Sequence, residues 1–112
     1  MSTEFNIITE THKDILVIKT DGYINNTAGE KIVEEFSKNF SDGMTKVVMD
    51  LEKSKVVNSI GISYLIDIIE KLNQTSGKLI FTNLDPTIEK TFNIMGIFQF
   101  AEKADSVDSA LK

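Results

Sequence analysis

The stretch from Lys46 to Leu72 decides the fold: K-V-V-M-D-L-E-K-S-K-V-V-N-S-I-G-I-S-Y-L-I-D-I-I-E-K-L. Its first half contains a short run of β-prone apolar residues, which predicts a buried strand: Val47, Val48, Met49 and Leu51. Its second half changes to the spacing of a helix that buries one face: Ile62, Leu65, Ile66, Ile69 and Leu72. Asn58 and Ser59 stand immediately before this pattern, where helix-capping residues belong. The stretch therefore predicts a strand, a polar connector and a helix that opens near Ser59.

Ser59 and Gly61 fall in the first turn of this predicted helix. A serine there has its hydroxyl beside unpaired backbone N–H groups and the positive end of the helix dipole, so a phosphate on it would be tolerated. The simpler interpretation is that Ser59 only caps the helix, which stabilises it by about 1 kcal/mol. Glycine at position 61 costs about 1 kcal/mol relative to alanine. It therefore indicates a close approach, either by an internal element or by the active site of a partner.

The composition is that of one globular domain. The chain has 112 residues, of which 41% are hydrophobic and 26% are charged, so it can form one packed core but not two. The absence of cysteine excludes disulfides and thiolate chemistry. The net charge of −5 disfavours binding to nucleic acid or anionic lipid. Because neither a signal peptide nor a long apolar run is seen, we expect no membrane insertion and a cytoplasmic location.

The residues before the central stretch predict a hairpin and a helix. Two strands, Phe5 to Glu10 and Ile15 to Ile18, are joined by a short polar link, which favours antiparallel pairing. Three capping residues then precede a helix: Asn25, Asn26 and Thr27. Its apolar positions are Ala28, Ile32, Phe36 and Phe40. Gly43 is predicted to lie just past its end in a left-handed conformation.

The residues after the central stretch continue the alternation. Lys78 to Thr82 predicts a buried strand, and Asp85 with Pro86 opens a helix that Gly96 ends. The buried stripe of this helix is predicted at Ile88, Phe92 and Met95. A last short strand and a final helix are expected to follow.

These elements together define an α/β fold. The last strand is predicted at Ile97 to Phe100, and Asp105 is predicted to cap the final helix. Strands that alternate with helices imply parallel pairing, and right-handed crossovers in one direction place their helices on one face. We predict a single domain over residues 1–112, with a mixed sheet of about five strands, an N-terminal antiparallel hairpin and four helices mainly on one face. The apolar run Ile15 to Ile18 indicates a strand covered on both faces or an apolar contact patch.

Candidate catalytic and metal-binding residues are few. The single histidine, His12, lies in a predicted turn, where a structural role is the usual one. No P-loop, G-x-G-x-x-G, G-x-S-x-G or H-E-x-x-H motif occurs. Asp50, close to Glu52, ends a buried strand, which is where α/β proteins place reactive groups, although an acid there more often caps a turn. We therefore expect no enzymatic activity, no cofactor and no metal.

The order of the motifs resembles the STAS domain family, specifically the bacterial anti-sigma factor antagonists. The strand ending in Asp50-Leu51, followed by V-V-N-S-I-G-I-S-Y-L, is similar to the strand, turn and helix that carry the phosphoacceptor in that family. Gly22 to Ala28 resembles the loop that opens the family's first helix. The family's C-terminal pattern is matched by Leu84, Pro86, Ile94, Gly96 and Phe100. The resemblance covers nearly the whole chain.

The resemblance implies a binding switch rather than an enzyme. Such a protein binds an anti-sigma factor that is also a serine kinase, and thereby releases a sigma factor. The resemblance implies that the kinase phosphorylates Ser59, that binding is then lost, and that a PPM-type serine phosphatase restores it. The partner-binding residues that it implies lie in two helix-opening segments: Tyr23, Asn25, Asn26, Thr27, Asn58, Ser59, Ile60, Gly61 and Ser63.

Two positions depart from the family pattern. Asn58 and Asn25 stand where the family usually has aspartate. Asparagine still caps a helix, but it supplies no carboxylate for a partner arginine. Two alternatives stay open: a phosphorylation-independent STAS scaffold or lipid-transport complex subunit, and a phospho-receiver domain. In the receiver, Asp50 would accept the phosphate, with Thr82 and Lys103 at later strand ends, but no acidic pair for magnesium follows the first strand.

Overall fold

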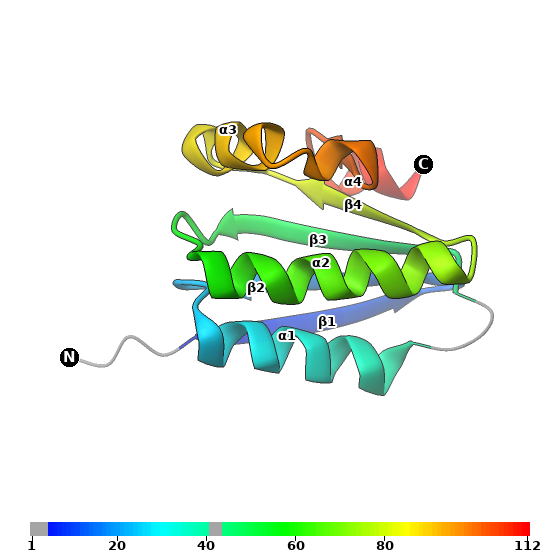
Figure 1. Ribbon diagram of the computed structural model, residues 1–112. Coiled ribbons are helices and arrows are strands. Elements are labelled where there is room, and N and C mark those ends of the chain that lie inside the picture. The colour runs from blue at the N-terminus through cyan, green and yellow to red at the C-terminus, as the bar shows by residue number, and fades with distance from the viewer. Residues whose placement is uncertain (1–4, 41–43) are drawn as a thin grey trace.

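Five strands form one mixed sheet with the spatial order β1-β2-β3-β4-β5. The computed structural model describes residues 5–40 and 44–112, and the helix end predicted at Gly43 lies outside these residues. The strands are β1 (Asn6–His12), β2 (Ile15–Asp21), β3 (Lys46–Lys53), β4 (Lys78–Thr82) and β5 (Glu102–Ala104). The β1–β2 pair is antiparallel, and the remaining pairs are parallel (Figure 1). The predicted hairpin and mixed sheet are therefore confirmed.

Three of the four helices cover one face of this sheet. The helices are α1 (Asn26–Asn39), α2 (Ser59–Gln74), α3 (Pro86–Ile94) and α4 (Val107–Leu111), with a 3-10 turn, η1 (Ile97–Gln99), after α3. Buried side chains of α1, α2 and α3 belong to the main core, whereas α4 packs against a separate apolar cluster. Figure 1 shows α1 and α2 side by side in front of the strands.

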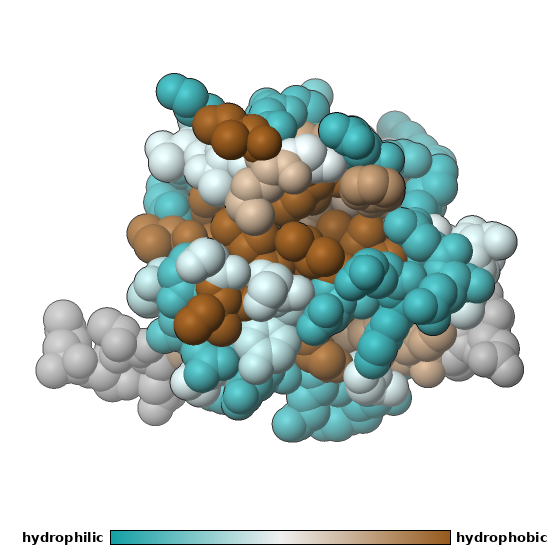
Figure 2. Space-filling model, viewed as in Figure 1, coloured by the Kyte–Doolittle hydropathy of each residue, from teal (hydrophilic) through white to brown (hydrophobic). Residues whose placement is uncertain are grey.

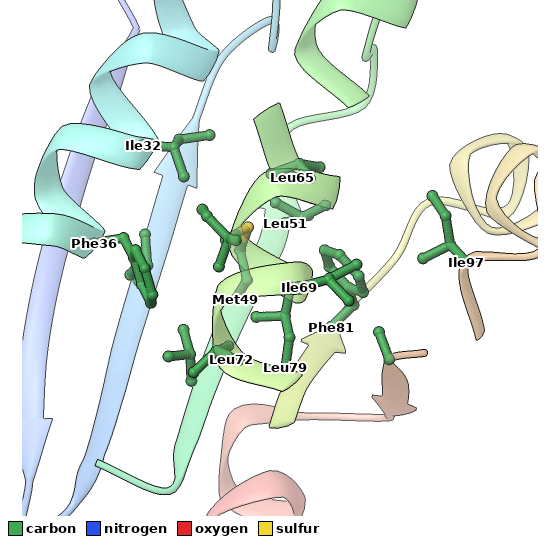
Figure 3. Packing of buried hydrophobic residues seen from close by; sticks show 14 of the residues in the cluster. Ile32, Phe36, Met49, Leu51, Leu65, Ile69, Leu72, Leu79, Phe81 and Ile97 are labelled. Carbon is green, nitrogen blue, oxygen red and sulfur yellow. The ribbon is translucent and has the colours of Figure 1, made fainter. Parts of the chain in front are cut away.

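The alternation of buried residues along β2 explains why helices lie on both faces. Leu16 and Ile18 point into the main core, while Val17 between them belongs to the second cluster. That cluster also includes Val48 of β3 and Ala110 of α4. Of the two explanations given for this apolar run, a strand covered on both faces is the one that the structure supports. Figure 3 shows the main core, where side chains of α1 and α2 meet those of β3 and β4.

The last strand was predicted at the wrong place. Ile97 to Phe100 does not form a strand: it follows Gly96, which has a φ of 74°, and Ala101 N–H donates to the Ile97 carbonyl at 3.0 Å. Four apolar or amide residues in a row fit a helical turn as well as a strand, and here the turn buries Ile97 against the core. The fifth strand is the more polar Glu102–Ala104, paired with β4.

Two smaller expectations for the last helices were also wrong. Met95 is 48% exposed because α3 ends at Ile94, so the position that would have continued the buried stripe lies past the last helical turn. The final helix is capped by Ser106 rather than Asp105, since the Ser106 hydroxyl oxygen accepts from Ser109 N–H at 3.1 Å. The Asp85 cap and the end of this helix at Gly96 are both confirmed, and Gly96 adopts a left-handed conformation.

Candidate functional site

Ser59 is the first residue of α2, and its side chain is exposed. The cap is Asn58, whose backbone is extended and whose Oδ1 accepts from Gly61 N–H at 2.7 Å. The Asn58 carbonyl accepts the first helical hydrogen bond, from Ile62 N–H at 3.0 Å. Asn58 therefore caps α2, and the hydroxyl of Ser59 faces outward from the first turn.

The loop that opens α1 lies directly against the loop that opens α2. Ile24 N–H donates to the Val56 carbonyl at 2.9 Å, and Asn58 N–H donates to the Ile24 carbonyl at 3.1 Å. These two bonds form a one-residue parallel bridge between Ile24 and Val57. Asn25 then caps α1, with its Oδ1 accepting from Ala28 N–H at 3.0 Å. The two segments that the sequence indicated are thus brought together at one edge of the sheet.

Gly61 is required by this internal packing. A Cβ at position 61 would lie 2.4 Å from the carbonyl oxygen of Ile24, which is backbone and cannot move aside. Of the two explanations for this glycine, close approach by an internal element is therefore the one that the structure supports. Gly61 itself is buried beneath the loop, so it contributes to the shape of the surface rather than to its exposed atoms.

Three large apolar side chains near Ser59 are exposed to solvent. Tyr23 is 46% exposed, Val56 57% and Ile60 51%. Tyr23 and Val56 precede the bridged residues Ile24 and Val57 in parallel extended segments, so their side chains leave the bridge on the same side. Val56 was not among the residues predicted from the sequence. The only sequence feature that pointed to it was the pair Val56-Val57. In an extended backbone, neighbouring side chains point in opposite directions, so one valine of the pair is exposed and the other is turned inward.

The remaining predicted residues lie on the first turns of the same two helices. Asn26, Thr27 and Ser63 are exposed. The Ser63 hydroxyl donates to the Ile60 carbonyl at 2.7 Å, so it is held against its own helix one turn beyond Ser59. We define the docking surface as seven exposed residues around Ser59 and the two half-buried caps, Asn25 and Asn58. The exposed residues are Tyr23, Asn26, Thr27, Val56, Ser59, Ile60 and Ser63.

Tyr64 positions the two helices, a role that no pattern in the sequence predicted. Its ring packs on α1 where Gly29 has no side chain: a Cβ there would lie 2.4 Å from Tyr64 Cδ2. The hydroxyl of Tyr64 lies 3.3 Å from Asn26 Oδ1 and 3.4 Å from Glu30 Oε1. Burial raises the pKa of Tyr64, and the nearby Glu30 carboxylate raises it further. Tyr64 therefore fixes the spacing of the two helix openings as a neutral phenol.

The helix ends at this surface carry no negative side chain. Neither α1 nor α2 has an acidic residue in its first turn, and both are capped by a neutral asparagine. In contrast, α3 has the cap Asp85 and Glu89 in its first turn, and α4 has Asp108. The positive ends of two helix dipoles therefore meet beside Ser59 without a compensating carboxylate. This arrangement tolerates an added anion better than the openings of α3 and α4 would.

Asp50 acts as a structural acid. One of its oxygens, Oδ1, accepts from Glu52 N–H and from Asn83 Nδ2, both at 3.0 Å, which ties the end of β3 to the end of β4. Lys103 is paired with Glu89 at 2.9 Å rather than directed at Asp50. The Oγ1 of Thr82 is buried and has no hydrogen-bond partner among the residues that the structure describes. These contacts, with the N-terminal hairpin, argue against the phospho-receiver alternative.

Neither a metal site nor a membrane span is found in the part of the chain that the structure describes. Over residues 5–40 and 44–112, no three histidine or acidic side chains gather in an arrangement suited to a metal ion. No helix in these ranges is long and apolar enough to cross a membrane.

The strand order, the hairpin and the paired helix openings together are those of a STAS domain. Residues 6–110 match the family model described as STAS domain, so the chain belongs to the STAS domain family. Among curated proteins, it is 25% identical over 96 residues to BtrV of Bordetella bronchiseptica, a candidate anti-sigma factor antagonist. That match covers 86% of this chain and 83% of BtrV.

Solved structures give the same fold. An anti-sigma factor antagonist from Mycobacterium paratuberculosis superimposes with a TM-score of 0.83 at 19% identity, covering 99% of this chain and 94% of that one. The Bacillus cell fate determinant SpoIIAA in its phosphorylated form gives a TM-score of 0.76 at 22% identity, covering 95% and 96%. The predicted STAS fold is confirmed, and these relatives are named as regulators rather than as enzymes.

Proposed function

We propose that this protein is an anti-sigma factor antagonist that binds its partner through the docking surface around Ser59. The observation that carries the proposal is the exposed hydroxyl of Ser59 on the first turn of α2, bordered by the exposed side chains of Tyr23, Val56 and Ile60. Exposed apolar side chains that surround a polar group are typical of protein interfaces. The relatives named as anti-sigma factor antagonists support this class of partner.

Phosphorylation of Ser59 would switch this binding off. A phosphate adds about −1.5 to −2 charge at pH 7 and three oxygen atoms. On a surface that packs closely against a partner, this group would cause a steric conflict and a large desolvation cost. The neutral caps of α1 and α2 would let the phosphorylated domain stay folded. Binding would then be lost without unfolding.

The proposed cycle needs two further proteins. The anti-sigma factor would itself be the serine kinase that modifies Ser59, and a PPM-type serine phosphatase would remove the phosphate. We propose both partners from the family resemblance, and we propose a cytoplasmic location for the cycle. The net charge of −5 supports the absence of nucleic acid among the partners. SpoIIAA, which has been solved in a phosphorylated form, shares the fold of this chain.

The two asparagines favour an apolar contact over a charged one. Asn25 and Asn58 use their Oδ1 atoms for capping and offer no carboxylate to a partner arginine. Tyr23, Val56 and Ile60 would therefore supply most of the binding free energy. The same asparagines also favour the second candidate, a phosphorylation-independent STAS scaffold or lipid-transport complex subunit. Kinase-dependent labelling of Ser59 separates the two, because only the switch requires it.

The test is a pull-down from the source cell with matched baits, compared by mass spectrometry. The baits are the wild type, Ser59→Ala, Ser59→Asp and a control, Ser37→Asp, which adds the same charge at an exposed position of α1 away from the docking surface. We expect the wild-type, Ser59→Ala and Ser37→Asp baits to retain an anti-sigma factor and Ser59→Asp to lose it. Equal recovery by Ser59→Asp would contradict the switch.

A further inference from the structure

A second apolar surface lies at the other end of α2. A groove of about 440 Å³ separates the C-terminal half of α2 from the segment that follows α3. Its lining residues are Ile66, Ile69, Glu70, Asn73, Gln74, Met95, Gly96, Ile97 and Phe100. Figure 2 shows the apolar band on this face, between α2 and α3. We call this hollow the α2–η1 groove.

The groove exists because the helix layer is packed unevenly. Gly29 lets α2 come close to α1 through Tyr64, whereas α2 makes little backbone contact with α3. Met95 and Phe100 border the resulting gap and are 48% and 63% exposed. A flexible thioether and an aromatic ring at the edge of an apolar hollow are residue types enriched in protein-binding surfaces.

The charge of the groove limits what can occupy it. Among the described residues, Glu70 is the only charged one in the lining, and no lysine or arginine of residues 5–40 and 44–112 contributes. Glu70 makes no ion pair with any other described residue. The whole chain carries a net charge of −5. A fatty acid carboxylate, an anionic lipid or a second copy of this acidic chain is therefore a poorer match than an apolar segment with positive charges beside it.

We propose that the α2–η1 groove binds a short amphipathic helix of a partner protein, with apolar side chains on one face and lysine or arginine along its border. The α2 wall extends from Ile66 to Gln74, which is about 12 Å of helix axis, or two turns. An occupying helix would place apolar anchors at i and i+3 or i+4 between Ile69, Ile97 and Phe100, with a cation facing Glu70. This site is separate from the docking surface and does not depend on the function proposed for it.

The test uses two designed peptides of equal length, one of leucine and lysine and one of leucine and glutamate, both with the leucines on one helical face. Each is titrated into the ¹⁵N-labelled full chain, and amide chemical shifts are followed. We expect the leucine–lysine peptide to shift the resonances of Ile66, Ile69, Gly96 and Phe100 selectively. Equal binding of the leucine–glutamate peptide, or shifts spread over the whole surface, would overturn the proposal.

Matched variants locate the site. Phe100→Ser and Glu70→Lys change exposed side chains of the groove, and Ile8→Ser removes a side chain that is 62% exposed on the opposite face. We expect each groove variant to bind the leucine–lysine peptide about fivefold or more weakly, because each loses one interface contact. Ile8→Ser should bind the peptide as tightly as the wild type does. Equal weakening in Ile8→Ser would contradict the assignment. Self-association of the wild type that Phe100→Ser abolishes would assign the groove to a second copy instead.

Discussion

Asn58 and Asn25 differ from aspartate only in the amide group, which affects charge at the docking surface but not helix capping. Each caps its helix through Oδ1, which aspartate also possesses. We therefore expect Asn58→Asp and Asn25→Asp to keep the stability of the wild type or raise it by about 0.3–1 kcal/mol, because a carboxylate at a helix N-terminus is favourable. Asn58→Ala, which lacks the acceptor, should lose about 1 kcal/mol. Urea denaturation measures all three.

If Asn58→Asp destabilised the domain as much as Asn58→Ala, the amide rather than the carbonyl oxygen would be the essential group. With equal stability, any change in partner binding caused by Asn58→Asp can be assigned to charge at the docking surface. That is the property in which the sequence resemblance predicts a departure from the family pattern.

Gly61 is the residue on which the shape of the docking surface depends. The added Cβ of Gly61→Ala would lie 2.4 Å from the Ile24 carbonyl oxygen and would force the two loops apart. We expect a loss of about 1–3 kcal/mol in the free energy of unfolding, despite the better helix propensity of alanine. Gly77→Ala is the control, since its Cβ would approach nothing closer than the Leu72 methyl at 3.1 Å. A Gly61→Ala domain as stable as Gly77→Ala would show that the loop yields easily.

At the scale of elements, we expect the junction of α1 and α2 to respond to alkaline pH through Tyr64. Burial and the Glu30 carboxylate raise the pKa of Tyr64, so the phenol ionises at higher pH in the folded chain than in the unfolded one. Its contribution to stability is complete below the ordinary tyrosine pKa of about 10 and is lost as pH rises through the folded value.

We expect the absorbance titration of the wild type to contain a tyrosinate component shifted above the ordinary tyrosine pKa of about 10, and Tyr64→Phe to lose this shifted component. The chain has two tyrosines, so the variant leaves Tyr23 as the only remaining signal. The free energy of unfolding of Tyr64→Phe should fall less steeply across this pH range than that of the wild type. A Tyr64 component that titrates at the ordinary tyrosine pKa of about 10 would contradict the packing of this ring between the helices.

The sequence predicted the elements that have a strong and unambiguous pattern. The helical spacing from Ile62 to Leu72 and the apolar runs of β3 and β4 identified these elements, and β4 was predicted with its observed bounds. The run from Ile97 to Phe100 was assigned wrongly because four residues are too few to distinguish a strand from one helical turn. What decided it was the left-handed Gly96, which starts a turn that buries Ile97.

The candidate site was predictable only where its residues form a local sequence pattern. Capping residues are visible in sequence, so both helix openings and Ser59 could be located. Val56 and Tyr64 could not, because their positions depend on contacts between segments: the bridge of Ile24 with Val57, and the fit of a ring over Gly29. Contacts between segments that lie far apart in the sequence produce no periodic pattern of residues from which they could be predicted.

At the scale of the whole molecule, α4 covers part of the second face of the sheet. Ala110 and Leu111 pack on the cluster formed by Val17, Val48 and Ile80, and Lys46 Nζ donates to the Ala110 carbonyl at 3.0 Å. We expect removal of residues 107–112 to expose this cluster and to lower the free energy of unfolding by about 2–4 kcal/mol, the value of uncovering two or three apolar side chains. Urea denaturation checks the loss, and wild-type stability in the truncated chain would contradict it.

The proposed function requires a domain that changes its binding without changing its fold. The most direct measurement is calorimetric titration of the anti-sigma factor, recovered with the wild-type bait, into the wild type, the Ser59-phosphorylated chain and Ser37→Asp. We predict that phosphorylation weakens binding by about tenfold or more, equal to 1.4 kcal/mol, while the free energy of unfolding changes by less than about 0.5 kcal/mol and Ser37→Asp binds normally. Unchanged affinity of the phosphorylated chain, or loss of binding only through unfolding, would contradict it.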